Sequence, residues 1–189
     1  MYKARNGQFR SEGDSPSFLH LIDVGLDIQK HPEYGGWGGR FVKSGNQWRS
    51  SQDKGDRSSL SCWIDAFQND FATRADWCVR SYQQSNHPPE MDSYKPVCIN
   101  ARPGQTITLS VSKITDPDGD ELKYYWWYYP ELQTFKGQIE LHQVNQQEYE
   151  LTIQKGEHSN GVVHVICNIT DNGNPPLTRY QRMVINIKP

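Results

Sequence analysis

The sequence is short of apolar residues and contains no long apolar run. Hydrophobic residues make up 35% of its 189 residues, and the mean hydropathy is −0.82. No apolar stretch approaches the roughly 18 residues of a membrane helix, so no membrane span is predicted. A basic block is also lacking, because the 20 Lys and Arg residues are scattered and are balanced by 22 Asp and Glu residues. This balance argues against nucleic-acid binding.

Secretory and cysteine signals are sparse as well. Met1 is followed by polar residues, so the chain is expected to be either cytosolic or a piece of a longer secreted protein. The four cysteines match no zinc spacing. Cys62 and Cys78 fall in one expected helix, where a separation of roughly 24 Å excludes a disulfide. Cys98 and Cys167 could approach each other across a sandwich, but free buried thiols are favoured. No arrangement of residues indicates catalysis, so no catalytic residue is assigned.

Aromatic residues are abundant, and many gather in one strand. The acidic turn Asp116–Asp120 is followed by the predicted strand Leu122–Tyr129. Because side chains alternate along a strand, Tyr125, Trp127 and Tyr129 share one face, and further apolar residues share the other. A half-buried strand needs only one apolar face. The second face therefore needs a partner, which could be another part of the chain, another chain or a ligand that stacks on rings.

The second half of the chain has the pattern of a β-sandwich. Seven short segments with alternating apolar residues are separated by turn residues, which is typical of an immunoglobulin-like sandwich. The expected strands are Pro96–Asn100, Thr106–Val111, Leu122–Tyr129, Gln138–Leu141, Glu148–Ile153, Val162–Thr170 and Arg179–Ile187. Pro88 and Pro89 end the preceding helix. The predicted organisation is one unit over residues 1–85, a Pro-rich linker over 86–91 and a sandwich over 92–189.

The first half is predicted to hold one long helix among loops. This helix spans Ser58–Tyr82, with Asp70 on its solvated side. Its apolar stripe consists of Trp63, Phe67, Phe71, Ala75, Cys78, Val79 and Tyr82. A shorter helix is expected to be capped by Asp14 or its neighbour and to end at Gly25. The glycine-rich loop around Trp37 is either a binding loop or a tight chain crossing, and the sequence favours neither.

Several motifs together resemble one bacterial family. They are Glu12–Leu19, Pro32–Arg40, Phe67–Cys78, Asn86–Pro89, the acidic turn and Thr170–Leu177. The combination resembles the C-terminal part of bacterial cellulose-binding proteins, in which a nucleoside-hydrolase-like domain precedes an immunoglobulin- or cadherin-like domain. The resemblance implies an α+β fold overall: a mainly-β immunoglobulin-like sandwich preceded by a helical and loop segment, the tail of an α/β domain.

The resemblance also implies a functional context. Residues 1–85 would contact the rest of the nucleoside-hydrolase-like domain, whose Asp-rich Ca²⁺ cluster does not occur in this sequence. Asp14 alone resembles a later metal-binding Asp of that family, and it would act only in the full-length protein. A polysaccharide partner and a secreted, periplasmic or cell-surface location follow from the same resemblance.

Two candidate sites follow from the residues themselves. Asp116, Asp118, Asp120 and Asp171 could supply oxygen ligands to Ca²⁺ between two loops, or they could form a hydrogen-bonded turn with solvated charges. The second candidate is a sugar-stacking platform.

The platform would consist of Tyr125, Trp127 and Tyr129, with Trp37 and Tyr34 as the next choice. The favoured alternative is that this face packs on the long helix, since large exposed apolar patches are rare.

The sequence therefore predicts a non-catalytic binding and structural module. The resemblance implies that it belongs to a secreted bacterial protein associated with polysaccharide, and with cellulose in particular. The alternative is part of a nucleoside-hydrolase-like N-glycosidase whose catalytic Asp cluster lies outside this chain. A third interpretation is a calcium-stiffened spacer without a ligand.

Overall fold

The computed structural model describes residues 2–3, 9–10, 18–51, 60–111, 113–154 and 160–188, the first two pairs by backbone only. These two pairs form strands β1 (Tyr2–Lys3) and β2 (Phe9–Arg10), which run antiparallel. Within the described residues, no helix is both long and apolar enough to cross a membrane. The predictions for Asp14 and for the helix start at Ser58 lie outside the described residues.

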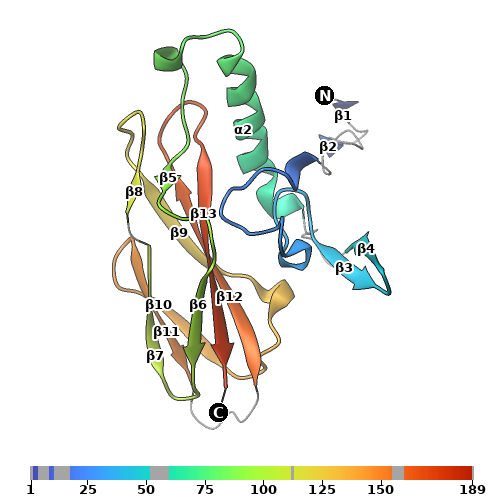
Figure 1. Ribbon diagram of the computed structural model, residues 1–189. Coiled ribbons are helices and arrows are strands. Elements are labelled where there is room, and N and C mark those ends of the chain that lie inside the picture. Colours follow the sequence, from blue (N-terminus) through green and yellow to red (C-terminus); the bar gives the residue numbers. More distant parts are fainter. Residues whose placement is uncertain are drawn as a thin grey trace.

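The second half of the chain forms two packed sheets (Figure 1). The four-stranded sheet has the order β6 (Val97–Ala101), β13 (Thr178–Ile187), β12 (Gly161–Thr170) and β9 (Lys123–Tyr128). The three-stranded sheet has the order β10 (Ile139–Gln143), β11 (Glu148–Ile153) and β7 (Thr106–Ser110). Neighbouring strands are antiparallel, except that β13 and β6 are parallel. The predicted mainly-β sandwich and its seven strands are confirmed.

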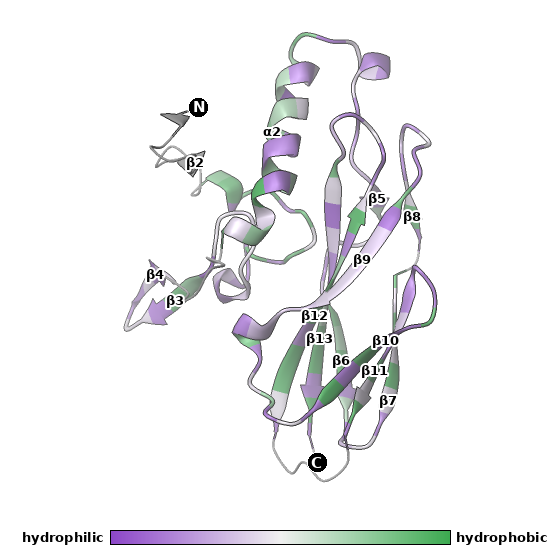
Figure 2. Cartoon of the chain, turned by 180° about the vertical axis from the view of Figure 1, so that it is seen from behind, coloured by the Kyte–Doolittle hydropathy of each residue, from purple (hydrophilic) through white to green (hydrophobic). Residues whose placement is uncertain are grey.

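The main core lies between the two sheets. Val163, Val165 and Ile169 of β12 face this space together with Leu109 and Leu151 of the three-stranded sheet, and all five are 0% exposed. The alternation that predicted the strands is thus the alternation that fills the core, and Figure 2 shows hydrophobic and hydrophilic segments along the sandwich strands. Each such side chain contributes about 1.5–3 kcal/mol when it is buried.

The four-stranded sheet is covered on its outer face as well. Residues 18–51 and 60–85, here called the N-terminal segment, pack against the other faces of β12 and β13 and form a second apolar cluster. Val24, Leu26 and Trp37 from the segment meet Ile166 and Tyr180 from the strands. Because both faces of β12 and β13 are covered, these strands are buried along most of their length. We call this contact the junction.

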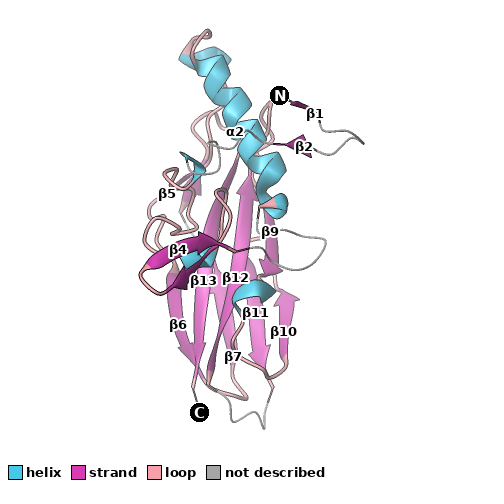
Figure 3. Ribbon diagram, turned by 90° about the vertical axis from the view of Figure 1, so that its right-hand side faces the viewer, coloured by secondary structure: helices cyan, strands magenta, loops and turns pink. Residues whose placement is uncertain are grey.

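The long helix is shorter than predicted, and its buried face differs. A 3-10 turn, η2 (Ser61–Trp63), leads into α2 (Ile64–Trp77), which lies alongside the upper part of the four-stranded sheet (Figure 3). Phe67 is buried as expected, but Phe71 is 68% exposed and Val79 is 80% exposed.

Asp70, predicted to be solvated, is only 2% exposed. The physical reason is a polar contact: Asp70 Oδ1 lies 3.4 Å from Arg179 Nη1 of β13, so a carboxylate occupies the buried face that periodicity assigned to apolar residues. Beyond α2 the chain forms η3 (Tyr82–Gln84), which Ser81 and Gln84 close with a capping box.

The glycine-rich loop is a tight chain crossing. A Cβ atom on Gly36 would lie 2.8 Å from the Ile28 side chain, and one on Gly38 would lie 2.4 Å from the His20 ring. Such distances are too short for any other residue, so the glycines allow the loop to pack against the preceding turn. Trp37 is thereby enclosed and is 0% exposed.

Smaller elements connect these parts. They are η1 (Pro32–Tyr34), the hairpin β3 (Phe41–Ser44) and β4 (Gln47–Ser50), the pair β5 (Glu90–Met91) and β8 (Ile114–Thr115), and η4 (Pro130–Leu132). The β5–β8 pair joins the linker to the strand that leads into the acidic turn.

In the described chain, Cys98 and Cys167 are both free, on β6 and β12 of one sheet with β13 between them. Two strand spacings alone amount to about 10 Å, which is already beyond disulfide reach. Cys167 is buried as predicted, whereas Cys98 is exposed.

Candidate functional site

The aromatic face of β9 is a packing surface. Tyr129 is 1% exposed, and the Trp127 ring lies 5.5 Å from the ring of Trp63, just before α2. Trp127 Nε1 also donates a hydrogen bond to Asn168 Oδ1 at 2.8 Å. Tyr125 is the exposed member of the predicted platform, at 66%. The flat three-ring platform is therefore wrong, since one ring is enclosed and another is engaged in the junction.

The second-choice sugar contacts do not form a platform either. Trp37 is enclosed, and its Nε1 donates a hydrogen bond to the Tyr180 hydroxyl at 3.2 Å. A buried indole cannot stack on a sugar, so this prediction is corrected. Tyr34 remains partly exposed and stacks on His31, with ring centroids 4.4 Å apart.

A buried arginine that the sequence analysis did not single out holds the junction together. Arg182 of β13 is 0% exposed. Its guanidinium donates hydrogen bonds to the carbonyl oxygens of Leu26 at 3.2 Å, Tyr34 at 3.1 Å and Gly35 at 2.9 Å. In the described part of the chain no carboxylate pairs with it; carbonyl dipoles and two tyrosine rings surround the charge. Burial lowers the pKa of Arg182 to about 10, so the group stays charged at neutral pH.

Burial, together with the same charge, keeps a neighbouring histidine neutral. His164 of β12 is 3% exposed, and its Nδ1 lies 3.4 Å from Nη1 of Arg182. Burial, and secondly the charge of Arg182, lower the pKa of His164 to about 3. A neutral imidazole can accept the hydrogen bond from the guanidinium, whereas an imidazolium would repel it. This arrangement is structural and leaves His164 no exposed surface for chemistry.

The acidic turn brings together three of the four aspartates predicted to bind Ca²⁺. Carboxylate oxygens of Asp116, Asp118 and Asp120 lie within 4.8 Å of one another. Asp116 Oδ1 accepts hydrogen bonds from the backbone N–H groups of Asp118 at 2.9 Å and Asp120 at 3.1 Å, which shapes the turn. Burial raises the pKa of Asp120, and the charges of its two neighbours raise it further. Asp171 lies outside this group of three, on the facing loop.

The linker is fastened to both loops. The His87 N–H donates to Asp118 Oδ2 at 2.6 Å, and its ring Nδ1 lies 3.0 Å from Asp118 Oδ1. The imidazole is stacked between Trp77 and Tyr82, with centroid distances of 5.6 and 3.7 Å. Asn86 Nδ2 donates to Asp171 Oδ1 at 3.1 Å. The linker, the end of α2 and the acidic loops therefore form one connected end of the molecule.

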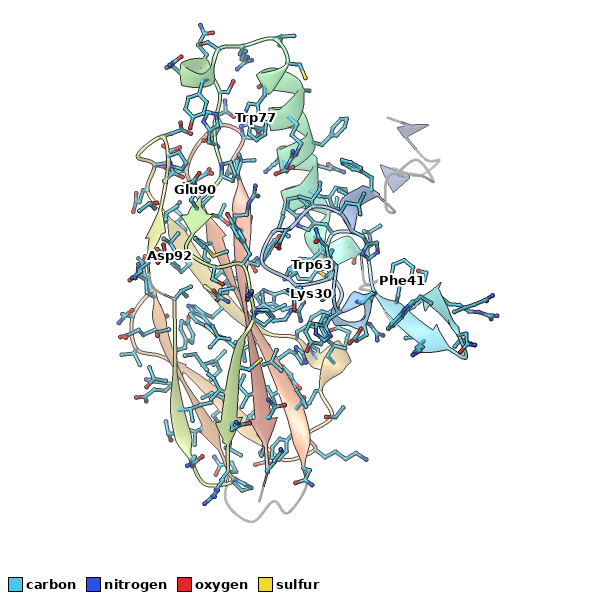
Figure 4. All side chains as sticks on the ribbon, in the orientation of Figure 1. Lys30, Phe41, Trp63, Trp77, Glu90 and Asp92 are labelled. Atoms are coloured by element: carbon cyan, nitrogen blue, oxygen red, sulfur yellow. The ribbon has the colours of Figure 1, made fainter. Side chains whose placement is uncertain are left out.

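A cleft of about 380 Å³ opens where the N-terminal segment meets the chain between β5 and β6. Its lining residues are Asp23, Val24, Asp27, Ile28, Gln29, Lys30, Met91, Asp92, Ser93, Tyr94 and Lys95. Figure 4 labels Lys30, which comes from the N-terminal segment, and Asp92, which comes from the chain between β5 and β6. Asp27 has a left-handed backbone with φ 56°, which Asp tolerates better than most residues. The cleft offers carboxylates, ammonium groups, an amide and one tyrosine ring, and the sequence analysis named none of these residues as a site.

Two parts of the chain match known families. Residues 106–187 match "Cellulose-binding protein Sde0182, C-terminal domain", and residues 1–41 match "Cellulose-binding Sde182, nucleoside hydrolase-like domain". The two matches occur in the order that the sequence motifs indicated. These matches confirm the predicted family. The cellulose-binding Sde0182 family thus combines the two parts found here, and no curated protein matches the chain.

One solved structure agrees with the family match. A nucleoside hydrolase-related hypothetical protein from Saccharophagus degradans, associated with carbohydrate metabolism, is 30% identical with a TM-score of 0.78; the match covers 97% of this chain and 49% of that chain. The present chain therefore spans about half the length of this relative. Mouse PcdhgC3 EC1-3 is 14% identical with a TM-score of 0.32, covering 53% of this chain and 33% of that one. Titin domain M7 is 15% identical with a TM-score of 0.33, covering 55% and 97%.

Proposed function

We propose that this chain is a non-catalytic, polysaccharide-binding part of a secreted bacterial protein, and that the cleft between Asp27 and Tyr94 holds the sugar. The observation that carries the proposal is the position and chemistry of the cleft. It lies where the two parts of the chain meet, and ligand sites occur preferentially at such boundaries. The family's cellulose-binding description supplies the ligand class.

The charges of the cleft suit a neutral sugar. The lining residues include three carboxylates, from Asp23, Asp27 and Asp92, and two ammonium groups, from Lys30 and Lys95, which leaves little net charge to attract a polyanion. Carboxylates and ammonium groups form strong hydrogen bonds with hydroxyl groups.

The apolar face of a sugar ring needs a flat partner, and Tyr94 supplies the aromatic ring among the lining residues. Tyr94 is partly exposed, so a ligand can reach its ring, whereas Trp37 and Tyr129 are enclosed in the core.

The test is binding to insoluble cellulose and to soluble cello-oligosaccharides by pull-down and calorimetry. Wild type is compared with Tyr94→Ala, which removes the ring, and with Asp27→Asn, which keeps a residue that tolerates a left-handed backbone. Tyr125→Ala is the matched control, because it removes an exposed tyrosine that is not a lining residue and that lies on β9, at the opposite edge of the sheet from β6. We expect Tyr94→Ala and Asp27→Asn to lose most of the binding and Tyr125→Ala to retain it.

Each result has a defined meaning. Loss of binding in Tyr125→Ala alone would move the site to the β9 face. Absence of binding by folded wild type to every glucan would refute the polysaccharide role of this chain.

The alternative function, part of a nucleoside-hydrolase-like N-glycosidase, is favoured by the match of residues 1–41 to that domain. Release of free ribose from nucleosides by a longer protein containing this chain, abolished by Asp14→Ala, would support it.

Such a protein would also test the partner of the N-terminal segment, where Leu21 is 70% exposed and Phe71 is 68% exposed. We propose that the remainder of the nucleoside-hydrolase-like domain covers these side chains. Phe71→Glu should then lower the melting temperature of the longer protein and leave that of the present chain unchanged; equal effects in both would refute the contact.

A further inference from the structure

Three carboxylates converge in the acidic turn because its backbone is tightly folded. Gly119 has φ 80°, and Asp116 Oδ1 accepts two backbone hydrogen bonds, which turns the chain back on itself. Asp116 Oδ2 remains buried with no hydrogen-bond partner among the described residues. Leaving a buried carboxylate oxygen unsatisfied is unfavourable, typically by about 1–3 kcal/mol or more. The turn therefore holds an oxygen that lacks a partner.

The facing loop supplies a second, independent observation. Asp171 is only 2% exposed, and its Oδ1 accepts hydrogen bonds from Asn86 Nδ2, Gly173 N and Leu177 N. Its Oδ2 is buried and has no hydrogen-bond partner in the part of the chain that the structure describes.

The two loops touch, because the Glu121 N–H donates to Asn172 Oδ1 at 2.9 Å. Burial raises the pKa of Asp171, and the charge of Asp116 on the turn contributes to that rise. Two unpartnered carboxylate oxygens thus lie in neighbouring loops.

The charge at this end is not compensated by the residues that surround it. Among the described residues, no Lys or Arg forms an ion pair with Asp116, Asp118, Asp120 or Asp171. His87 contacts Asp118 and can offset at most one of the four negative charges. A hard divalent cation would satisfy both the charge and the orphan oxygens at once.

We propose that this end of the sandwich binds one Ca²⁺ ion through Asp116, Asp118 and Asp120, with Asp171 completing the site from the facing loop. All candidate ligands are oxygens on irregular loops, which suits Ca²⁺; Zn²⁺ prefers nitrogen and sulfur, and Mg²⁺ demands stricter geometry. Asn86 and His87 bond Asp171 and Asp118 directly, so the ion would also fix the linker against the sandwich. This inference does not depend on the proposed sugar site.

The experiment is calorimetric titration of the metal-free chain with CaCl₂, together with thermal unfolding in EDTA and in CaCl₂. Asp120→Asn is the informative variant, because the Asp120 side chain makes no hydrogen bond in the described structure and its removal leaves the turn intact. Asp65→Asn, an exposed aspartate on α2, is the control with the same change in charge.

We expect wild type to bind one Ca²⁺ with a Kd of about 10⁻⁴–10⁻³ M, the range of extracellular Ca²⁺-binding modules, or tighter. Asp120→Asn should bind about tenfold more weakly, since the ligand charge is reduced. In EDTA it should melt at the same temperature as wild type or higher, because repulsion between carboxylates is relieved. Asp65→Asn should match wild type in both buffers.

Three results would overturn the proposal. They are absence of heat and of a melting shift in folded wild type up to about 10 mM CaCl₂, unchanged Ca²⁺ affinity in Asp120→Asn, and an equal effect of MgCl₂ at the same concentration. The last would indicate screening of charge rather than a built site.

Discussion

His164 should make the stability of this protein fall in mild acid. Its ring is buried in the junction beside the Arg182 guanidinium, and burial lowers its pKa to about 3. An unfolded chain would titrate the same histidine near 6.5. Because the folded-state pKa is the lower of the two, the unfolded state binds the proton first. The stability that His164 contributes is therefore complete above about pH 6.5 and is lost as the pH falls from there toward 3.

The size of the effect follows from the two pKa values. Linkage between about 6.5 and about 3 gives a loss near 2 kcal/mol when the pH is lowered from about 7 to about 5. For a protein of this size, a change of 2 kcal/mol lowers the melting temperature by about 4–8 °C.

The assay is thermal unfolding by circular dichroism at several pH values, comparing wild type with His164→Gln. Glutamine keeps an acceptor for Arg182 but does not titrate, so the difference in pH slope isolates this one group. His142→Gln, on the exposed side of β10, is the matched control and should keep the wild-type slope. If His164→Gln loses stability between about pH 7 and 5 as steeply as wild type does, the burial argument is refuted.

Two further substitutions probe the junction. Gly25→Ala should destabilise the fold by about 3 kcal/mol or more, because Gly25 has φ 93° and an added Cβ would lie 1.8 Å from the Tyr180 carbonyl oxygen. Gly45→Ala is the control, because Gly45 has φ 60° in open space, and it should cost about 1 kcal/mol. Equal unfolding midpoints of the two variants in urea would contradict the close approach of Gly25 to Tyr180. Arg182→Met should cost about 3–5 kcal/mol, because three buried carbonyl groups lose their donor; a neutral effect on chemical denaturation would show that water or repacking satisfies them.

The sandwich was predicted from local sequence patterns. The seven strands were found because each is short, alternates along its own length and ends in turn residues, all of which are properties of neighbouring residues. The motif order also indicated the family, which the matches confirm. The two apolar faces of β9 implied a second partner, and the favoured partner, the long helical segment, contacts Trp127 through Trp63.

Tertiary contacts decided the rest. Periodicity placed Phe71 on the buried side of α2 and Asp70 outside, but the helix docks on a strand end that offers Arg179, and a carboxylate is the better partner there.

Arg182 is one basic residue in a strand, and nothing near it in the chain signals the three carbonyl groups that converge on it. The cleft joins residues 23–30 to residues 91–95. By itself, the sequence determined the strands, the turns and the family, because these depend on adjacent residues. Which faces meet, and therefore which polar groups are buried or reachable, depended on contacts between distant segments and was settled only by the folded chain.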